Sequence, residues 1–495
     1  MIVNPTIFGK RDDSFIKESA INFYDYDGTL LYSYTPKEFE AYATLPPLPK
    51  REELACERWN YTQGEINDCV EAFGVCNVGA IYKSDTTKIH IHVEDDTSSL
   101  EFCCYPNGKV TINWGDGNES TLEGSSLNEI KSAIHTYADS DSYVISLIVD
   151  KQVAFRGSAE GGADILKSQT GALAKNQIYQ NCIKEINLGS GVIIGDYAFA
   201  NCKHLEKISI PSGIEQIASH AFSYCQSLDS IFLPTGLSII KDHAFEYCLS
   251  LNVIGIPNSL TSIESYAFSN CQALKEFIAF SAPLANEGVF QYCSSLSKVN
   301  AAPGEQIGNY IFRECSSLKN FNLPEGINTI GDYAFDHCTS LDSIKIPSTV
   351  EEIGSQAFAA CFSLKSVEFL GENETKIETL KDYAFSYCTS LNRVKLPNSI
   401  TSIANYLFYY CPSLASVTLL GDIKTVGAGA FNSCSGVSYF DFTKCTGVPV
   451  LASVYAFSGI DEKCEIRVPL SLIGDWGNSS EHPNWVVYKD NIRGV

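Results

Sequence analysis

The phrase Ala-Phe-x-x-Cys-x-x-Leu, with small changes, returns along most of the chain. Counted from its cysteine, it occurs in eleven copies, at Cys202, Cys225, Cys248, Cys271, Cys293, Cys315, Cys338, Cys361, Cys388, Cys411 and Cys434. Seven of the ten spacings are 23 residues, two are 22 and one is 27, which marks an insertion. A repeat of this length predicts a solenoid, because one copy is too short to enclose its own apolar residues and stacking supplies the missing walls.

Each copy has the same internal order. After the cysteine come a leucine and then two apolar residues at alternate positions, as in Leu205, Ile208 and Ile210, which predicts one short strand. Proline follows this strand in six copies, as at Pro211, because proline has no N–H to continue a ladder. A second apolar pair, spaced Ile-x-x-Ile, then leads to the Tyr-Ala-Phe segment, which turns the chain back.

This order of residues resembles the BspA-like class of leucine-rich repeat proteins over residues 176–460. The resemblance implies a leucine-rich-repeat solenoid and, for function, binding and adhesion at surfaces rather than one particular ligand. We therefore expect a mainly β protein with short helical turns, in which a small β-sandwich domain precedes the solenoid. Residues 176–460 hold the eleven clear copies and a degenerate first one at Ile178–Cys182. Residues 461–495 form a cap, with Trp485 and Tyr488 covering the last core layer.

The first third of the chain has no repeat. Residues 1–85 are predicted to be an attachment region, with a β-hairpin that turns at Asp27-Gly28, a linker containing Pro46, Pro47 and Pro49, and a helical stretch from Thr62 to Phe73. Residues 86–155 show alternating apolar positions typical of strands. Their Trp114-Gly115-Asp116-Gly117 and His135-Thr136-Tyr137 motifs resemble the polycystic-kidney-disease (PKD) type of immunoglobulin-like domain.

Composition narrows the classes of partner. The chain has 35 basic and 58 acidic side chains, a net charge of -23, so nucleic acid is not an expected partner. No stretch reaches the roughly 18 apolar residues of a membrane span. Eleven of the nineteen cysteines occupy one core column, where cysteine packs as a small hydrophobe, and we expect reduced thiols there.

No enzyme, cofactor or metal site is predicted. The string from Asp25 to Leu30, Asp-Tyr-Asp-Gly-Thr-Leu, matches the first motif of haloacid-dehalogenase-type phosphatases. A doubly wound sheet has no room before the next β-domain, so we interpret the string as a turn. His220 and His243 occupy equivalent positions in adjacent copies, and two ligands without a carboxylate make a poor metal site.

Two columns of variable residues are candidates for a ligand surface. Tyrosines that precede the cysteine offer an apolar ring with a polar tip, although rings stacked on one another would have only a structural role. The outward-facing strand positions change from apolar in early copies to charged in late ones, and the late strands are the favoured site. The candidate residues are Phe232, Ile278, Lys345, Glu368, Arg393, Lys395, Tyr224, Tyr247, Tyr292, Tyr387 and Tyr410.

These features predict a non-enzymatic recognition or adhesion protein. The first twenty residues show no apolar export signal, and the order of the parts is similar to that of repeat proteins from gut bacteria and their phages. The most concrete expectation is a phage virion fibre or decoration protein that contacts protein or glycan on a host surface and joins other virion proteins through its N-terminal region. The alternatives are a bacterial cell-surface adhesin and an intracellular protein-interaction scaffold.

Overall fold

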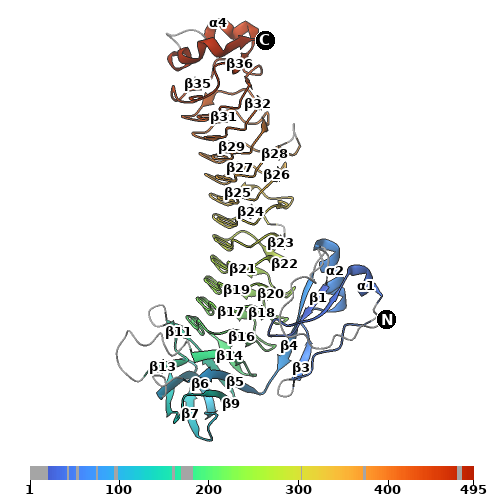
Figure 1. Cartoon of the computed structure of the whole chain (residues 1–495), viewed down its shortest axis with the longest axis vertical. Coiled ribbons are helices and arrows are strands. Elements are labelled where there is room, and N and C mark those ends of the chain that lie inside the picture. The colour runs from blue at the N-terminus through green and yellow to red at the C-terminus, as the bar shows by residue number, and fades with distance from the viewer. Residues whose placement is uncertain are drawn as a thin grey trace. The chain divides into compact units, whose positions relative to one another are not determined.

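The structure is a computed structural model of the whole chain, shown in Figure 1. It forms two compact units: unit 1 is Met1–Ser262 with Ile278–Ser281, and unit 2 is Ile263–Phe277 with Ala282–Val495. In the part of the chain described below, no helix has both the length and the apolar character to cross a membrane. The described residues are 21–41, 44–51, 55–73, 76–93, 99–158, 162–168, 182–302, 304–371, 375–476 and 482–495.

Unit 1 begins with a small α/β domain, here called the N-terminal domain. Its four-stranded sheet has the order β2-β1-β4-β3, in which β1 runs parallel to β4 and the other neighbours are antiparallel. The predicted linker prolines therefore lie within a folded domain rather than between domains. The elements are β1 (Ile21–Tyr24), β2 (Leu30–Tyr34), α1 (Pro36–Glu40), β3 (Ala55–Trp59), α2 (Gln63–Phe73) and β4 (Cys76–Lys83).

Local sequence signals account for the elements of this domain. β1 and β2 form a hairpin whose turn contains Gly28 at a φ of 77°, a left-handed conformation that glycine adopts without strain. The Thr35 side chain accepts a hydrogen bond from the Glu38 backbone N–H, and the Glu38 side chain accepts one from the Thr35 backbone N–H. Together these bonds satisfy two donors at the start of α1. Phe23 and Trp59 pack edge to face in the core beneath the helices.

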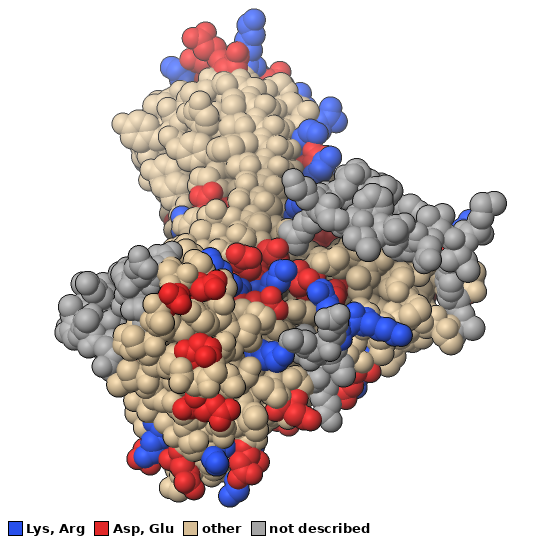
Figure 2. All heavy atoms as spheres, turned by 60° about the horizontal axis from the view of Figure 1, so that its bottom comes forward, with Lys and Arg blue, Asp and Glu red and all other residues tan. Residues whose placement is uncertain are grey.

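A β-domain follows and continues directly into the repeats. Most of its strands belong to a sheet ordered β15-β10-β6-β9-β5-β14-β16, with β7, β8 and β13 also paired to the long strand β6, while β11 and β12 pair with each other. On the face drawn in Figure 2, its acidic side chains form separate groups among uncharged and basic ones. The strands are β5 (Thr86–His92), β6 (Ser99–Asn113), β7 (Glu119–Ser125), β8 (Lys131–Thr136), β9 (Ser142–Val149), β10 (Gln152–Phe155), β11 (Gly157–Ser158), β12 (Gly162–Ala163) and β13 (Leu166–Ser168).

The two motifs of the β-domain lie against each other. The Trp114 and His135 rings stack with centroids 4.8 Å apart, and His135 Nε2 lies 2.7 Å from a carboxylate oxygen of Asp116. The Tyr137 hydroxyl donates to the Trp114 carbonyl over 2.9 Å. These contacts tie the loop after β6 to the end of β8.

The β-domain closes the first turns of the solenoid. β5 pairs with the first repeat strand β14, and β14 pairs in parallel with β16, while β10 pairs with β15 on another side of the same turn. Paired edges do not recruit other chains. Except for Cys182, the degenerate copy predicted at residues 178–182 lies outside the described residues. The repeat strands here are β14 (Ile183–Asn187), β15 (Val192–Ile194), β16 (Lys207–Ser209), β17 (Gln216–Ile217), β18 (Ser230–Phe232), β19 (Ile239–Ile240), β20 (Val253–Gly255), β21 (Ser262–Ile263) and β22 (Glu276–Pro283).

Unit 2 repeats the same turn. The longer strands form a seven-stranded parallel sheet from β26 to β37, here called the strand face, and two-residue strands form a second set of ladders. The strands are β23 (Lys298–Ala302), β24 (Gln306–Ile307), β25 (Thr329–Ile330), β26 (Ser343–Ile346), β27 (Glu352–Ile353), β28 (Ser366–Phe369), β29 (Thr379–Leu380), β30 (Arg393–Leu396), β31 (Ser402–Ile403), β32 (Ser416–Leu419), β33 (Thr425–Val426), β34 (Tyr439–Asp441), β35 (Val450–Leu451), β36 (Glu465–Val468) and β37 (Ile492–Gly494).

The C-terminal segment covers the last turn of unit 2. Trp476 and Trp485 are buried and pack on each other, and Trp485 also packs on Phe457, the last phenylalanine of the core column. The Tyr488 ring meets the same phenylalanine edge to face. The remaining elements are η4 (Leu470–Leu472), α4 (Ile473–Trp476) and η5 (Pro483–Asn491).

The core of the solenoid consists of columns of identical residues. Phenylalanines of consecutive turns stack, as in Phe222 on Phe245 with centroids 5.3 Å apart and Phe358 on Phe385 at the same distance. In most copies the cysteine thiol donates to the carbonyl of the phenylalanine one turn earlier, as from Cys338 to Phe312 over 3.1 Å. The same bond is made by Cys225, Cys248, Cys293, Cys315, Cys361, Cys388, Cys411 and Cys434.

The thiol column explains why the repeat uses cysteine. A thiol fills the space of a small apolar side chain and also satisfies a buried carbonyl. Burial raises the pKa of Cys293 and of Cys388 to about 12, so these groups stay protonated and keep their donor hydrogen.

We expect the column thiols of the native protein to resist alkylation. The reactive species is the thiolate, which burial disfavours, so labelling of Cys293 and Cys388 should be at least about a hundredfold slower in native protein than in denaturant. Iodoacetamide labelling followed by peptide mass spectrometry measures both rates. Equal rates in the two conditions would contradict the buried column.

Candidate binding surfaces and a histidine cluster

Each turn of the solenoid contains two residues in the left-handed backbone conformation. One lies two residues before the phenylalanine and the other directly before the cysteine. This conformation is strained for bulky residues, whereas glycine adopts it freely and asparagine tolerates it better than most. The first column is Tyr197, His220, His243, Tyr266, Gly288, Tyr310, Tyr333, Gln356, Tyr383, Tyr406 and Gly429; the second is Asn201, Tyr224, Tyr247, Asn270, Tyr292, Glu314, His337, Ala360, Tyr387, Tyr410 and Ser433.

The first left-handed column is mainly structural. Its rings are half-buried and stack along the solenoid, as in Tyr310 on Tyr333 at 4.9 Å and Tyr383 on Tyr406 at 4.7 Å. Where the stack meets Gln356, the amide donates to the Tyr333 hydroxyl over 2.6 Å. These contacts agree with the alternative interpretation of the tyrosines, in which the rings stack on one another and have a structural role.

The second left-handed column is more exposed. In unit 2, Tyr387 and Tyr410 are 41% and 46% exposed, and their ring centroids lie 5.5 Å apart. Phe362, which follows the cysteine of the preceding copy, is 43% exposed, and Tyr409 packs edge to face against Tyr387. We call Phe362, Tyr387, Tyr409 and Tyr410 the aromatic edge.

The other tyrosines of this column are more scattered. Tyr224 is exposed and stacks on the half-buried Tyr247 in unit 1, with the two planes 8° apart and the centroids at 4.6 Å. Tyr292 is exposed in unit 2, and the next residue of its column is Glu314 rather than an aromatic one.

The late strand face is polar and accessible. Outward positions on β26, β28 and β30 are exposed while the alternate positions are buried. Lys345 lies opposite Glu368, with their charged atoms 3.5 Å apart, and Arg393 and Lys395 follow on the next strand. An exposed pair of this kind adds little stability. The face therefore has charges of both signs.

The early strand positions are covered by the N-terminal domain. Phe232 is only 3% exposed because it packs between Gly79 on β4 and Gly255 on β20, and it stacks on Tyr24. Ile278 packs against the core of the same domain. Both residues were candidates for a ligand surface, and for Phe232 this expectation was wrong. The sequence gives no local signal for this burial, because the glycine that makes room for the Phe232 ring, Gly79, lies in another domain of unit 1.

The Asp-Tyr-Asp-Gly string belongs to the same junction. One oxygen of the buried Asp25 accepts from the Tyr82 hydroxyl and the other from Arg51, which also pairs with Asp27. The Tyr26 hydroxyl donates to Glu185 of the first repeat strand over 2.7 Å. Both oxygens of Asp25 are therefore bonded within the fold, and residues 25–29 form the turn between β1 and β2.

Removal of the Phe232 ring should destabilise unit 1. Phe232→Ala is expected to cost about 3–5 kcal/mol of unfolding free energy, because it deletes a buried ring between two glycines that cannot fill the space. Urea unfolding followed by hydrogen exchange of β4 measures this loss. Phe362→Ala, at an exposed phenylalanine, is the control and should change stability by about 0.5 kcal/mol or less. Equal losses in the two variants would show that the ring is not part of a packed junction.

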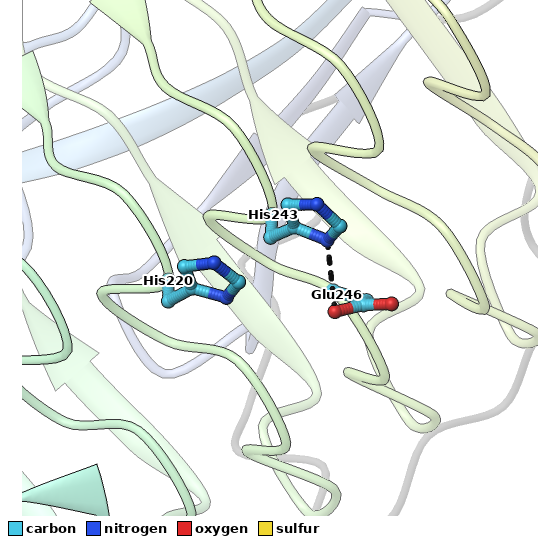
Figure 3. Close-up of side chains that lie close together, drawn as sticks. All are labelled: His220, His243 and Glu246. Atoms are coloured by element: carbon cyan, nitrogen blue, oxygen red, sulfur yellow. Dashed lines mark hydrogen bonds and ion pairs between the residues drawn. The ribbon is translucent and has the colours of Figure 1, made fainter. Parts of the chain in front are cut away.

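The structure brings three potential metal ligands together in unit 1. His220 and His243 stack with centroids 4.6 Å apart and planes at 6°, and His243 Nδ1 lies 3.0 Å from Glu246 Oε2. The ligand atoms of the three residues all lie within 4.8 Å of one another. Figure 3 shows the two rings oriented alike, with a nitrogen of each on the side of Glu246. The sequence indicates the two histidines as neighbours, and the structure adds the carboxylate of Glu246, three residues after His243.

The two stacked histidines have opposite electrostatic surroundings. The hydrogen bond to Glu246 raises the pKa of His243, whereas burial, with the neighbouring His243 as a second cause, lowers the pKa of His220. Protonation of His243 therefore stabilises the fold below the ordinary pKa of 6.5, and this contribution is lost as the pH rises through the raised value. Protonation of His220 costs stability as the pH falls below 6.5.

We expect the two rings to titrate separately. Between pH 5 and 8, His243 should gain its proton at a higher pH than 6.5, because it hydrogen-bonds Glu246 over 3.0 Å. His220 should gain its proton at a lower pH, because burial outweighs the effect of Asp242, whose carboxylate lies 3.9 Å away. Histidine-selective ¹³C NMR of the protein, with His220→Tyr and His243→Tyr for assignment, follows both titrations. A common midpoint near 6.5 would contradict this geometry.

Comparison with known proteins identifies the repeats. The family model of the BspA type leucine-rich repeat region matches residues 192–304, 285–380, 305–438 and 370–472, more than half of the chain. A leucine-rich repeat protein from Bacteroides ovatus is similar in fold, at a TM-score of 0.52 and 23% identity over 78% of this chain and 98% of that one.

Two further solved structures are similar over shorter stretches. A leucine-rich cell surface protein from Faecalibacterium prausnitzii has a TM-score of 0.38 and 24% identity over 64% of this chain and 87% of its own. The pneumococcal vaccine antigen PcpA has a TM-score of 0.43 and 19% identity over 72% and 85%. No curated protein matches the chain. The repeated turn, its Phe and Cys columns and the family match together show that the chain belongs to the BspA-type leucine-rich repeat family.

Proposed function

We propose that this protein is a non-enzymatic recognition or adhesion protein that binds protein or glycan through the aromatic edge of unit 2. The observation that carries the proposal is the exposure of Phe362, Tyr387 and Tyr410, each more than 40% accessible, on consecutive turns. Membership of the BspA-type family supports a binding role of this general kind.

The backbone at these positions supports a role beyond packing. Tyr387 and Tyr410 have φ values of 58° and 57°, at positions where Asn201 and Asn270 occupy the same conformation at lower cost. A bulky ring in this conformation is strained, and strain retained at an exposed site points to function. Their stacking on neighbouring rings offsets part of that cost.

The chemistry of the aromatic edge suits sugars and protein loops. Tyrosine rings provide flat apolar area with few rotatable bonds and a hydroxyl that both donates and accepts hydrogen bonds. Several rings on consecutive turns form an extended surface rather than a pocket, which fits a polymer or a macromolecular surface. Tyr387, Tyr410 and the strand-face residue Lys395 lie on neighbouring copies, and the strand face is the second candidate because its outward side chains are accessible.

The location of the protein is a further part of the proposal. We propose a phage virion fibre or decoration protein, with a bacterial cell-surface adhesin as the alternative, on the basis of the similar order of parts in such repeat proteins. We also retain the PKD-type resemblance for residues 86–155, supported by the Trp114, His135 and Tyr137 contacts. Mass spectrometry of purified particles and of membrane and wall fractions from the source distinguishes the two locations.

Replacement of the two exposed tyrosines should abolish binding without unfolding the protein. Tyr387→Asn with Tyr410→Asn removes the rings but keeps a residue that tolerates the left-handed backbone. We expect at least a tenfold loss of binding to a glycan array and to a panel of whole cells, and a change in unfolding free energy of about 1 kcal/mol or less.

The strand face provides the matched control. Lys345→Glu with Lys395→Glu reverses two exposed charges and should leave binding through the aromatic edge within about twofold of the unaltered protein. If instead the charge reversals abolish binding and the asparagine variant binds normally, the site is the late strand face. Unaltered binding by both variants would overturn the assignment of either surface.

A further inference from the structure

We propose that His220, His243 and Glu246 bind one divalent transition-metal ion of the zinc class. This site is independent of the aromatic edge, since all three residues belong to unit 1. Among the described residues, these three side chains form a group of two histidines and one carboxylate whose ligand atoms lie close enough together to hold an ion.

The ligand atoms already lie close together, and metal binding then requires the two stacked rings to rotate out of their parallel planes so that their lone pairs converge on one ion. Zinc binds histidine nitrogen at about 2.0–2.1 Å and carboxylate oxygen at about 2.0–2.2 Å, so ligand atoms of a tetrahedral site lie roughly 3.3–3.5 Å apart. His243 Nδ1 and Glu246 Oε2 are already 3.0 Å apart, and no pair within the group exceeds 4.8 Å. The side chains of the three residues are 18–28% exposed, which leaves the rings free to tilt toward a common point.

The donor set selects the class of ion. Two imidazole nitrogens and one carboxylate suit zinc and its neighbours in the transition series, whereas calcium and magnesium prefer sites made of oxygen alone. Three protein ligands leave a position open, and because the cluster is half-buried, solvent can fill it.

A neighbouring carboxylate favours the tautomer of His220 that metal binding requires. Asp242 Oδ2 lies 3.9 Å from His220 Nε2, so a proton is favoured at Nε2 and the lone pair at Nδ1 is left for the ion. At His243 the metal replaces the proton shared with Glu246. Ser219 donates to the other oxygen of Asp242 over 2.5 Å and so holds that carboxylate in place.

A bound ion would join consecutive turns of the solenoid. His220 comes from the turn that ends at Cys225, while His243 and Glu246 come from the next one. The stacked ring of Tyr197, 4.5 Å from His220, closes the other side of the site. The metal would therefore link two adjacent turns of the solenoid through His220 and His243 of the first left-handed column.

Zinc binding by the full-length protein without a histidine tag tests the site. Isothermal titration at pH 7.5 should show one zinc ion per chain, with affinity reduced at least tenfold in each of His220→Tyr, His243→Tyr and Glu246→Gln. Tyrosine is the matched replacement, because Tyr197 and Tyr266 occupy the same column with the same left-handed backbone. His337→Tyr, at a histidine outside the cluster, should bind zinc normally, and so should Cys56→Ser, which removes the half-buried thiol of the N-terminal domain.

A second readout separates the site from nonspecific binding. Cobalt in place of zinc should give visible absorption of a nitrogen- and oxygen-bound ion without the intense near-ultraviolet band of a thiolate complex, and zinc should raise the melting temperature of unit 1 only when all three ligands are present. Absence of zinc binding at 100 μM metal, or unchanged affinity in Glu246→Gln and both tyrosine variants, would overturn the proposal. Normal zinc binding with failed glycan and cell binding would leave this site intact and overturn only the proposed function.

Discussion

The contact between equivalent residues of consecutive turns holds this structure together. A phenylalanine ring buries its faces on the rings before and after it, and each burial of this size contributes about 1.5–3 kcal/mol. The cysteine thiol beside these rings donates to the carbonyl of the phenylalanine one turn earlier, as Cys338 does to Phe312. Backbone bonds run between the same turns, as from Phe335 N–H to the Ala357 carbonyl over 2.7 Å. No single copy can make these contacts, so stability comes from the array.

The same constraint explains where the sequence is free to vary. Because both turn positions are left-handed in every copy, the backbone admits glycine, asparagine, tyrosine or histidine there but gives none of them a core contact. At these positions Tyr387 and Tyr410 expose their rings to solvent. His220 and His243 place two imidazoles close to the Glu246 carboxylate. Surfaces with different chemistry therefore arise on one repeated backbone.

Unit 1 shows how the fold limits the available surface. The N-terminal domain covers early strands with Tyr24, while the Tyr61 hydroxyl donates to the carbonyl of Ile256, which directly follows β20. The β-domain adds its own strands to the first turn. The opposite end of the chain closes unit 2 by the different means of the buried Trp476 and Trp485. Binding is left to surfaces that none of these elements covers.

The sequence by itself determined the repeated turn, its family and its core, because Phe, Cys and Leu recur at a fixed spacing and each occupies the same buried position. It also indicated that the Asp27-Gly28 segment turns and that the cysteines are core residues. Only the tertiary structure decided that Phe232 is buried, since Gly79 is 153 residues away in sequence and no local pattern joins them. It likewise showed that the Glu246 side chain turns toward the two stacked histidines, because a separation of three residues in a turn does not by itself fix where a side chain points.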